Sequence, residues 1–62
     1  MKEDLVMKVS ELYTVLNDLQ EVWNKLNWSI VPPEISEQYP FHKDLGQMTD
    51  DIKSWLELIK KS

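Results

Sequence analysis

Cysteine and arginine are absent from this sequence of 62 residues, and glycine and histidine each occur once. Without cysteine, neither a disulfide nor a thiolate metal site can form. His42 is then the only nitrogen ligand for a metal, and structural zinc sites are rarely built from carboxylates. The single glycine, Gly46, excludes a glycine-rich loop that cradles phosphates. We therefore expect this protein to hold no metal and no cofactor.

Positive charge is also scarce. Seven lysines face eleven acidic residues, which gives a formal net charge of −4. Proteins that bind nucleic acids normally carry a basic stripe, and helices that lie on membranes carry a cationic face. No apolar run approaches the roughly 18 residues of a membrane span, and early acidic residues argue against a signal peptide. We expect a cytoplasmic protein that contacts neither nucleic acid nor a membrane.

Side chains with catalytic potential are few and scattered. His42 is the only one whose ordinary pKa lies near neutrality, and its charged neighbours Lys43 and Asp44 indicate a solvated position. Asp50 and Asp51 form an acidic pair, but a divalent ion needs more converging ligands than two. The sequence therefore predicts no catalytic residues, and we expect that this protein is not an enzyme.

The N-terminal part of the chain has the periodicity of an amphipathic helix. Apolar residues recur from residue 5 at alternating spacings of four and three, which is the heptad pattern of one helix face. The pattern predicts a helix over residues 2–26, with Glu3 and Asp4 in the first turn, where the helix dipole favours anions. The residues expected to pack are Leu5, Val9, Leu12, Leu16, Leu19, Trp23 and Leu26.

The C-terminal part has a second stripe of the same kind. It begins at Phe41 and predicts a helix over residues 41–61. A start at Leu45 is the alternative, because Asp44 and Gln47 form a capping-box pattern. The residues of this helix expected to pack are Leu45, Met48, Ile52, Trp55 and Ile59.

The connector between these stretches is long and unusually apolar. Two antiparallel helices are usually joined by about two to eight residues, whereas more than ten separate these stretches. Pro33 is suited to open one short helical turn within the connector. Large apolar side chains have no role in a solvated loop, so we expect them to cover the helix ends or to bind a partner. The predicted protein-binding residues are Trp28, Ile30, Val31, Ile35, Tyr39 and Phe41.

Together these elements predict one all-α domain over residues 1–62, an antiparallel two-helix hairpin with a long apolar connector. Val15 and Val22 flank the first stripe, and Leu56 and Leu58 flank the second. One facing helix covers only a narrow seam, so flanking apolar residues require further helices to cover them. We expect hairpins to pair into a homodimeric four-helix bundle, or one hairpin to dock on the helices of a partner.

Contact with another protein is the function that these features favour. The leading hypothesis is a small non-enzymatic regulator or inhibitor, of the kind that phages and mobile elements often encode; that association is an analogy. One alternative is a structural or assembly module, either a homodimeric four-helix bundle or a small subunit of a larger complex. Another is a weakly acidic DNA mimic that blocks a nucleic-acid-binding protein, because ordered carboxylates can occupy a basic groove.

Overall fold

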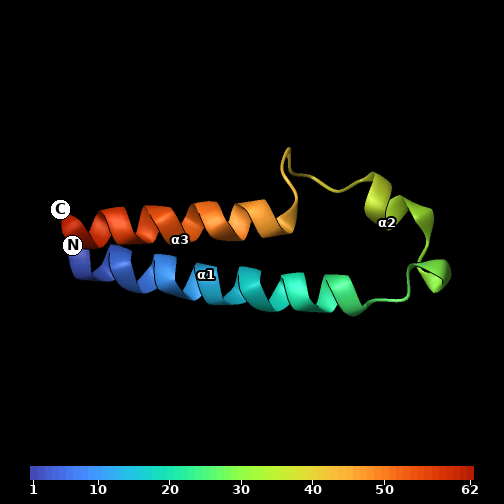
Figure 1. Ribbon diagram of the computed structural model, residues 1–62, viewed down its shortest axis with the longest axis horizontal. Helices are drawn as coiled ribbons and strands as arrows, with labels where there is room; N and C mark the ends of the chain where they lie inside the picture. Colours follow the sequence, from blue (N-terminus) through green and yellow to red (C-terminus); the bar gives the residue numbers. More distant parts are fainter.

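The computed structural model describes all 62 residues, and every regular element in it is helical. In chain order these are α1 (Lys2–Lys25), the 3-10 turn η1 (Trp28–Ile30), the short α2 (Pro33–Glu37) and α3 (Leu45–Lys61). The long helices α1 and α3 contact each other and run antiparallel, with both chain termini at one end (Figure 1). The prediction of an all-helical chain with two long helices in contact is confirmed, and Pro33 opens the predicted short helix.

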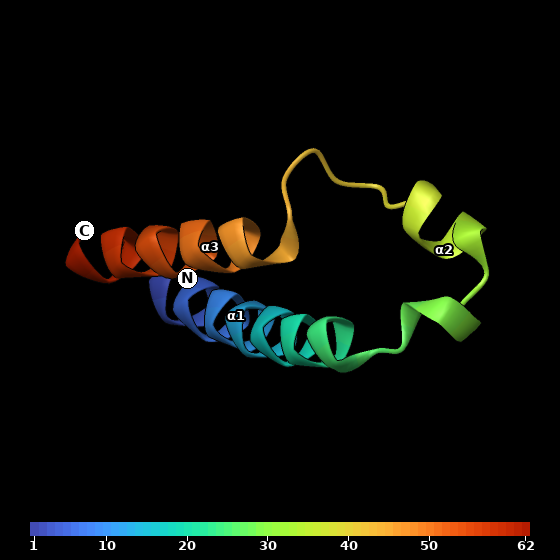
Figure 2. The same cartoon turned by 45° about the vertical axis from the view of Figure 1, so that its right-hand side comes forward.

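The two long helices differ in length, and the connector spans from the end of the longer α1 back to the start of the shorter α3. α1 has 24 residues and is about 36 Å long, whereas α3 has 17 residues. From the end of α1 the chain passes through η1 and α2 and then arches back to the start of α3 (Figure 2). α1 ends one residue earlier than predicted, because Leu26 has extended backbone angles, φ −68° and ψ 137°.

The predicted start of the second helix at Phe41 is wrong, because α3 begins at Leu45. Asp44 is its N-cap residue, and the Asp44 Oδ1 atom accepts a hydrogen bond of 2.8 Å from the backbone N–H of Gln47. This bond satisfies one of the first N–H groups of the helix, which have no partner within it. The cap therefore decides where α3 begins, although the apolar periodicity extends one turn further back.

The C-terminal end of α3 is held by a residue near the N-terminus of the chain. The Lys2 ammonium group donates hydrogen bonds to the backbone oxygens of Lys60, at 3.2 Å, and of Ser62. Carbonyl groups at a helix C-terminus lack helical partners and carry partial negative charge, so a lysine there is favourable. This contact joins the two termini of the antiparallel pair.

The core between α1 and α3 is small, and α3 is rotated from its predicted orientation. Trp55 was expected to pack but is 46% exposed, and the neighbouring Leu56 is buried instead. Both possible rows share Leu45, Ile52 and Ile59, so the periodicity fits either rotation. The six buried residues are Val9, Leu16, Leu45, Thr49, Leu56 and Ile59.

Thr49 is the one polar residue in this core. Its hydroxyl group donates a hydrogen bond of 2.7 Å to the backbone oxygen of Leu45, one turn earlier in α3. A buried hydroxyl group is costly only when it lacks a partner. This internal bond therefore allows α3 to turn Thr49 toward α1 and Trp55 away from it.

α1 is also rotated relative to the prediction. Val9 and Leu16 are buried, and Tyr13 and Trp23 are half-buried. Four of the five leucines of the predicted stripe are only partly covered, since between 39% and 45% of each residue stays exposed. These leucines therefore lie at the edge of the seam with α3; they are Leu5, Leu12, Leu19 and Leu26.

Candidate protein-binding site

Aromatic side chains hold the connector against the end of the helix pair. The ring centroids of Trp23 and Trp28 are 4.5 Å apart, and Tyr39 lies 5.4 Å from Trp23. The indole N–H of Trp28 donates a hydrogen bond of 3.2 Å to the backbone oxygen of Trp23. That oxygen lies in the last turn of α1, where carbonyl groups have no helical partner. Trp28 therefore both packs on α1 and caps its end.

Tyr39 links the connector to both long helices. Its ring packs on Trp23 of α1, and its hydroxyl oxygen lies 3.7 Å from the sulfur of Met48 in α3. The same hydroxyl group lies 2.7 Å from the backbone oxygen of Lys43. Because a hydroxyl group has one proton, we assign the hydrogen bond to the shorter contact with Lys43 and treat the sulfur contact as packing. Tyr39 thus fixes the segment of the connector that leads back to α3.

The six predicted binding residues consequently divide into two groups. Trp28, Val31 and Tyr39 are half-buried, and the two aromatic residues among them serve the internal packing just described. The other three stay exposed to solvent, with Ile30 the most open at 78%. We call these three the connector tip; they are Ile30, Ile35 and Phe41. Phe41 also packs its ring on that of Tyr39, with the ring centroids 5.4 Å apart.

The 3-10 turn η1, which the apolar periodicity does not predict, orients Ile30. Asn27 precedes it, and the Asn27 Oδ1 atom accepts hydrogen bonds from the backbone N–H of Ser29, at 3.2 Å, and from the Ser29 hydroxyl group, at 2.6 Å. An asparagine that bonds two residues ahead is a common turn device, and Asn27 with Ser29 was an available signal for it.

Most of the remaining exposed apolar residues belong to the two long helices. We call the main set the leucine face; its residues are Leu5, Leu12, Val15, Leu19 and Val22 of α1, Leu26 directly after α1, and Trp55 and Leu58 of α3. Val15 and Val22, which were expected to pack against further helices, are 61% and 60% exposed. Nothing else in the chain covers them.

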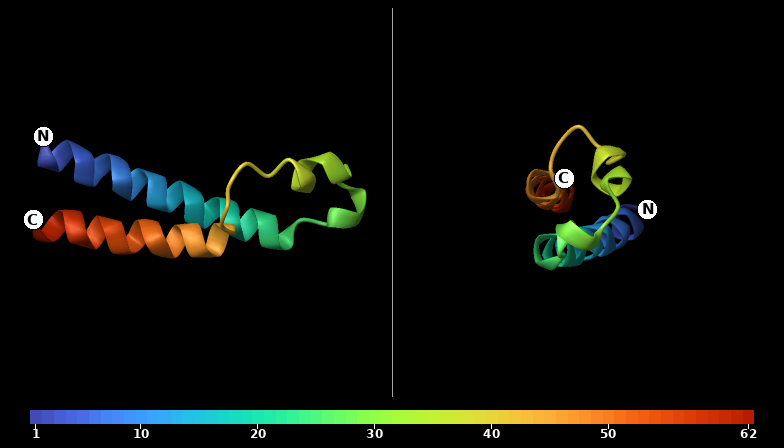
Figure 3. Two further views of the ribbon diagram at one scale, coloured as in Figure 1. Left: turned by 90° about the horizontal axis from the view of Figure 1, so that it is seen from above. Right: turned by 90° about the vertical axis from the view of Figure 1, so that its right-hand side faces the viewer.

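These residues lie on one side of the helix pair. Tyr39 contacts both Trp23 and Met48, so these two side chains share a side. Leu19 is one turn before Trp23, and Trp55 is two turns after Met48, so both lie on that same side. Seen from the end, the connector also lies to one side of the pair (Figure 3). It covers only the end where the chain turns.

The other side of α1 is polar. Ser10, Asn17 and Asn24 follow each other at intervals of seven residues, so they form one row along the helix. Asn17 and Asn24 are exposed. The helix pair therefore has two chemically different sides, one of them mainly apolar.

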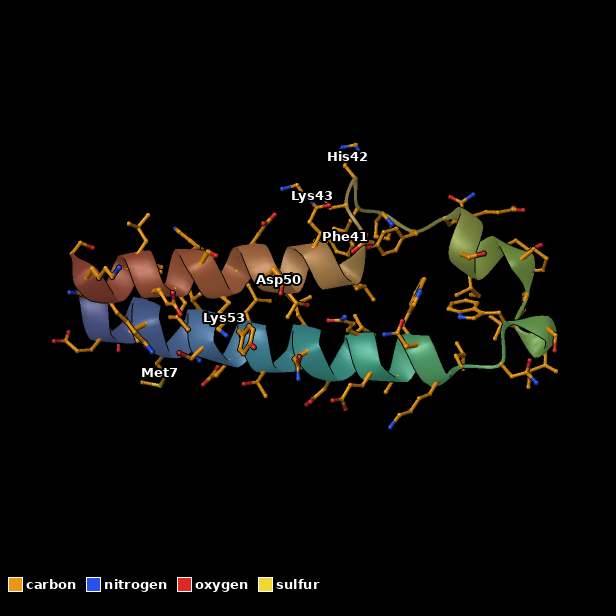
Figure 4. All side chains as sticks on the ribbon, in the orientation of Figure 1. Met7, Phe41, His42, Lys43, Asp50 and Lys53 are labelled. Atoms are coloured by element: carbon orange, nitrogen blue, oxygen red, sulfur yellow. The ribbon has the colours of Figure 1, made fainter.

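Charged residues form few contacts. Lys43 pairs with Asp51 at 2.6 Å, and Lys8 pairs with Glu11 at 3.4 Å, both on the surface. His42 projects away from the helix pair (Figure 4), and no three histidine, aspartate or glutamate side chains are grouped to hold a metal ion. None of the helices has the length and apolar character needed to cross a membrane.

Two shallow hollows lie along α1, and both are open to solvent. Neither brings together the residues that the sequence analysis predicted to bind a partner. One is lined by Lys2, Glu3, Val6, Met7 and Lys60, and the other by Met7, Ser10, Glu11, Thr14 and Val15.

Comparison with known proteins adds no relative to this picture. No family model, no curated protein and no solved structure matches the chain.

Proposed function

We propose that this chain is a small, non-enzymatic, cytoplasmic regulator or inhibitor that acts by binding one other protein through the connector tip. The observation that carries the proposal is the exposure of Ile30, at 78%, on a connector that aromatic packing holds in place. An apolar side chain already held in its bound position loses little conformational freedom on binding, which favours affinity.

The free energy gained by burying these apolar side chains is sufficient for specific recognition. Moving one isoleucine from water into an apolar pocket contributes about 2 kcal/mol. That free energy corresponds to about a thirty-fold change in affinity. Ile30 lies in η1 and Ile35 in α2, whereas Phe41 lies beside the start of α3 (Figure 4). A few exposed apolar anchors of this kind commonly supply most of the binding energy of an interface.

A photo-crosslinking amino acid at position 30 tests the proposal in extract of the source cells. We expect one discrete crosslinked protein, identified by mass spectrometry, that is absent when the probe is placed at Asn17 on the polar side. The Ile30→Asp variant should abolish capture of that protein by the tagged chain. Equal products from positions 30 and 17, or capture that survives Ile30→Asp, would contradict binding at the tip.

Salt dependence separates this proposal from the DNA-mimic alternative. A contact built on apolar side chains should keep its affinity between low salt and about 0.5 M salt, because screening acts on charges. A carboxylate array that occupies a basic groove should lose affinity steeply over the same range. The measurement is the dissociation constant of the captured protein at each salt concentration.

A further inference from the structure

We infer that the leucine face binds a second copy of this chain, so that two helix pairs form a four-helix bundle with each connector at the end of its own pair. This contact uses a different surface from the connector tip. It therefore does not depend on whether the tip binds a target.

The spacing of the leucine face suits a helix-to-helix contact. Its four leucines are seven residues apart, and Val15 and Val22, also seven apart, each follow a leucine by three. Two such rows side by side form the a/d seam along which helices pack knobs into holes. α1 thus has one seam toward α3 and a second, uncovered seam, and the leucine row lies between them. Lys8 is the only charged residue in the valine row.

The surface area of the chain supports an uncovered interface of ordinary size. The chain exposes 5077 Å², whereas a compact monomer of 7.4 kDa is expected to expose about 4,200 Å². The excess, about 900 Å², is close to the roughly 800 Å² that each partner buries in a standard protein interface. The radius of gyration is 14.2 Å, which is also larger than the value of about 10.6 Å expected for a compact domain of this length.

A second copy is the occupant that the chemistry of this face favours. Charges on this face are few and of both signs, with Lys8 in the valine row of α1 and Asp51 in the row of Leu58 in α3, so the face can pair with itself about a two-fold axis. The connector of the same chain cannot cover it, because Tyr39 already lies at the far end, between Trp23 and Met48. The stretch from Leu5 to Leu19 stays open.

Light scattering on the full chain, with matched variants, tests this inference. The wild type should have a mass of about 15 kDa at 200 µM, twice that of the 7.4 kDa chain. Val15→Glu combined with Val22→Glu should give the monomer mass. Asn17→Glu combined with Asn24→Glu adds the same charge to the polar side and should leave the dimer intact.

A gain-of-contact variant makes the test independent of folding defects. Lys8→Val completes the valine row, and we expect it to lower the dimer dissociation constant at least three-fold. A wild type that stays at 7.4 kDa up to 1 mM would overturn the inference. Equal dissociation of the two glutamate pairs, or a Lys8→Val dimer no tighter than the wild type, would do the same. Crosslinking from position 30 reports on the tip separately, so the two proposals can fail independently.

Discussion

Replacing Leu56 with alanine should destabilise the single chain far more than replacing the larger Trp55. Leu56 is 8% exposed and lies in the core cluster with Val9 and Ile59, whereas Trp55 is 46% exposed. Removing a buried leucine side chain costs about 2–5 kcal/mol, and less where neighbours can collapse into the space. Because this core is thin and open at its edges, we expect about 2–2.5 kcal/mol.

That loss is large for a chain of this size. A domain of 62 residues has a free energy of unfolding of about 3–9 kcal/mol. At about 4–8 °C per kcal/mol, Leu56→Ala should lower the Tm by roughly 8–20 °C. Trp55→Ala removes a side chain that makes few contacts within the chain, and we expect it to cost less than about 1 kcal/mol.

Circular dichroism at 222 nm, with unfolding by heat and by urea, measures both effects. The background should be Val15→Glu with Val22→Glu, so that self-association does not contribute. In the wild-type background at high concentration, Trp55→Ala should then become more costly, because Trp55 belongs to the leucine face. If Trp55→Ala costs as much as Leu56→Ala in the monomeric background, the rotation of α3 described above is wrong.

Three smaller perturbations test local features, each by urea unfolding. Asp44→Ala removes the bond to the Gln47 N–H and should cost about 1 kcal/mol; no loss would mean that the helix begins before Leu45. Gly46→Ala should raise the free energy of unfolding by about 0.5 kcal/mol through helix propensity. The new Cβ would meet only the flexible end of Gln20, at 3.1 Å, and the Asp44 carboxylate, at 3.4 Å. A net loss of stability would show that Gln20 cannot move. Trp28→Phe keeps an aromatic ring but loses the indole N–H, and should cost about 1 kcal/mol; an unchanged stability would mean that this bond forms equally well with water.

The sequence predicted which segments are helical but not how the helices are rotated. Heptad spacing showed two amphipathic helices, and Pro33 indicated the short helix in the connector. The same spacing fits a row through Trp55 and a row through Leu56, because both include Leu45 and Ile59. Only the packing of α3 on α1, with the hydroxyl group of Thr49 satisfied inside its own helix, selects the second row.

Which connector residues stay exposed was predicted only in part, for a similar reason. Unusual hydrophobicity identified the connector, and Ile30 and Ile35 are exposed as a binding surface requires. Which aromatic residues would turn inward depended on contacts between distant segments, such as Tyr39 with Trp23. The leucine face was anticipated only through Val15, Val22 and Leu58, because the leucines of the first stripe were expected to pack against the second helix.

Isotope-filtered NOESY on a mixture of ¹³C-labelled and unlabelled chains tests most directly whether one side of the helix pair is a protein-binding surface. The account predicts intermolecular contacts from the methyl groups of Leu12, Val15 and Leu19, and none from the side of Asn17 and Asn24. Intermolecular contacts confined to the polar side, or none at concentrations up to 1 mM, would contradict it.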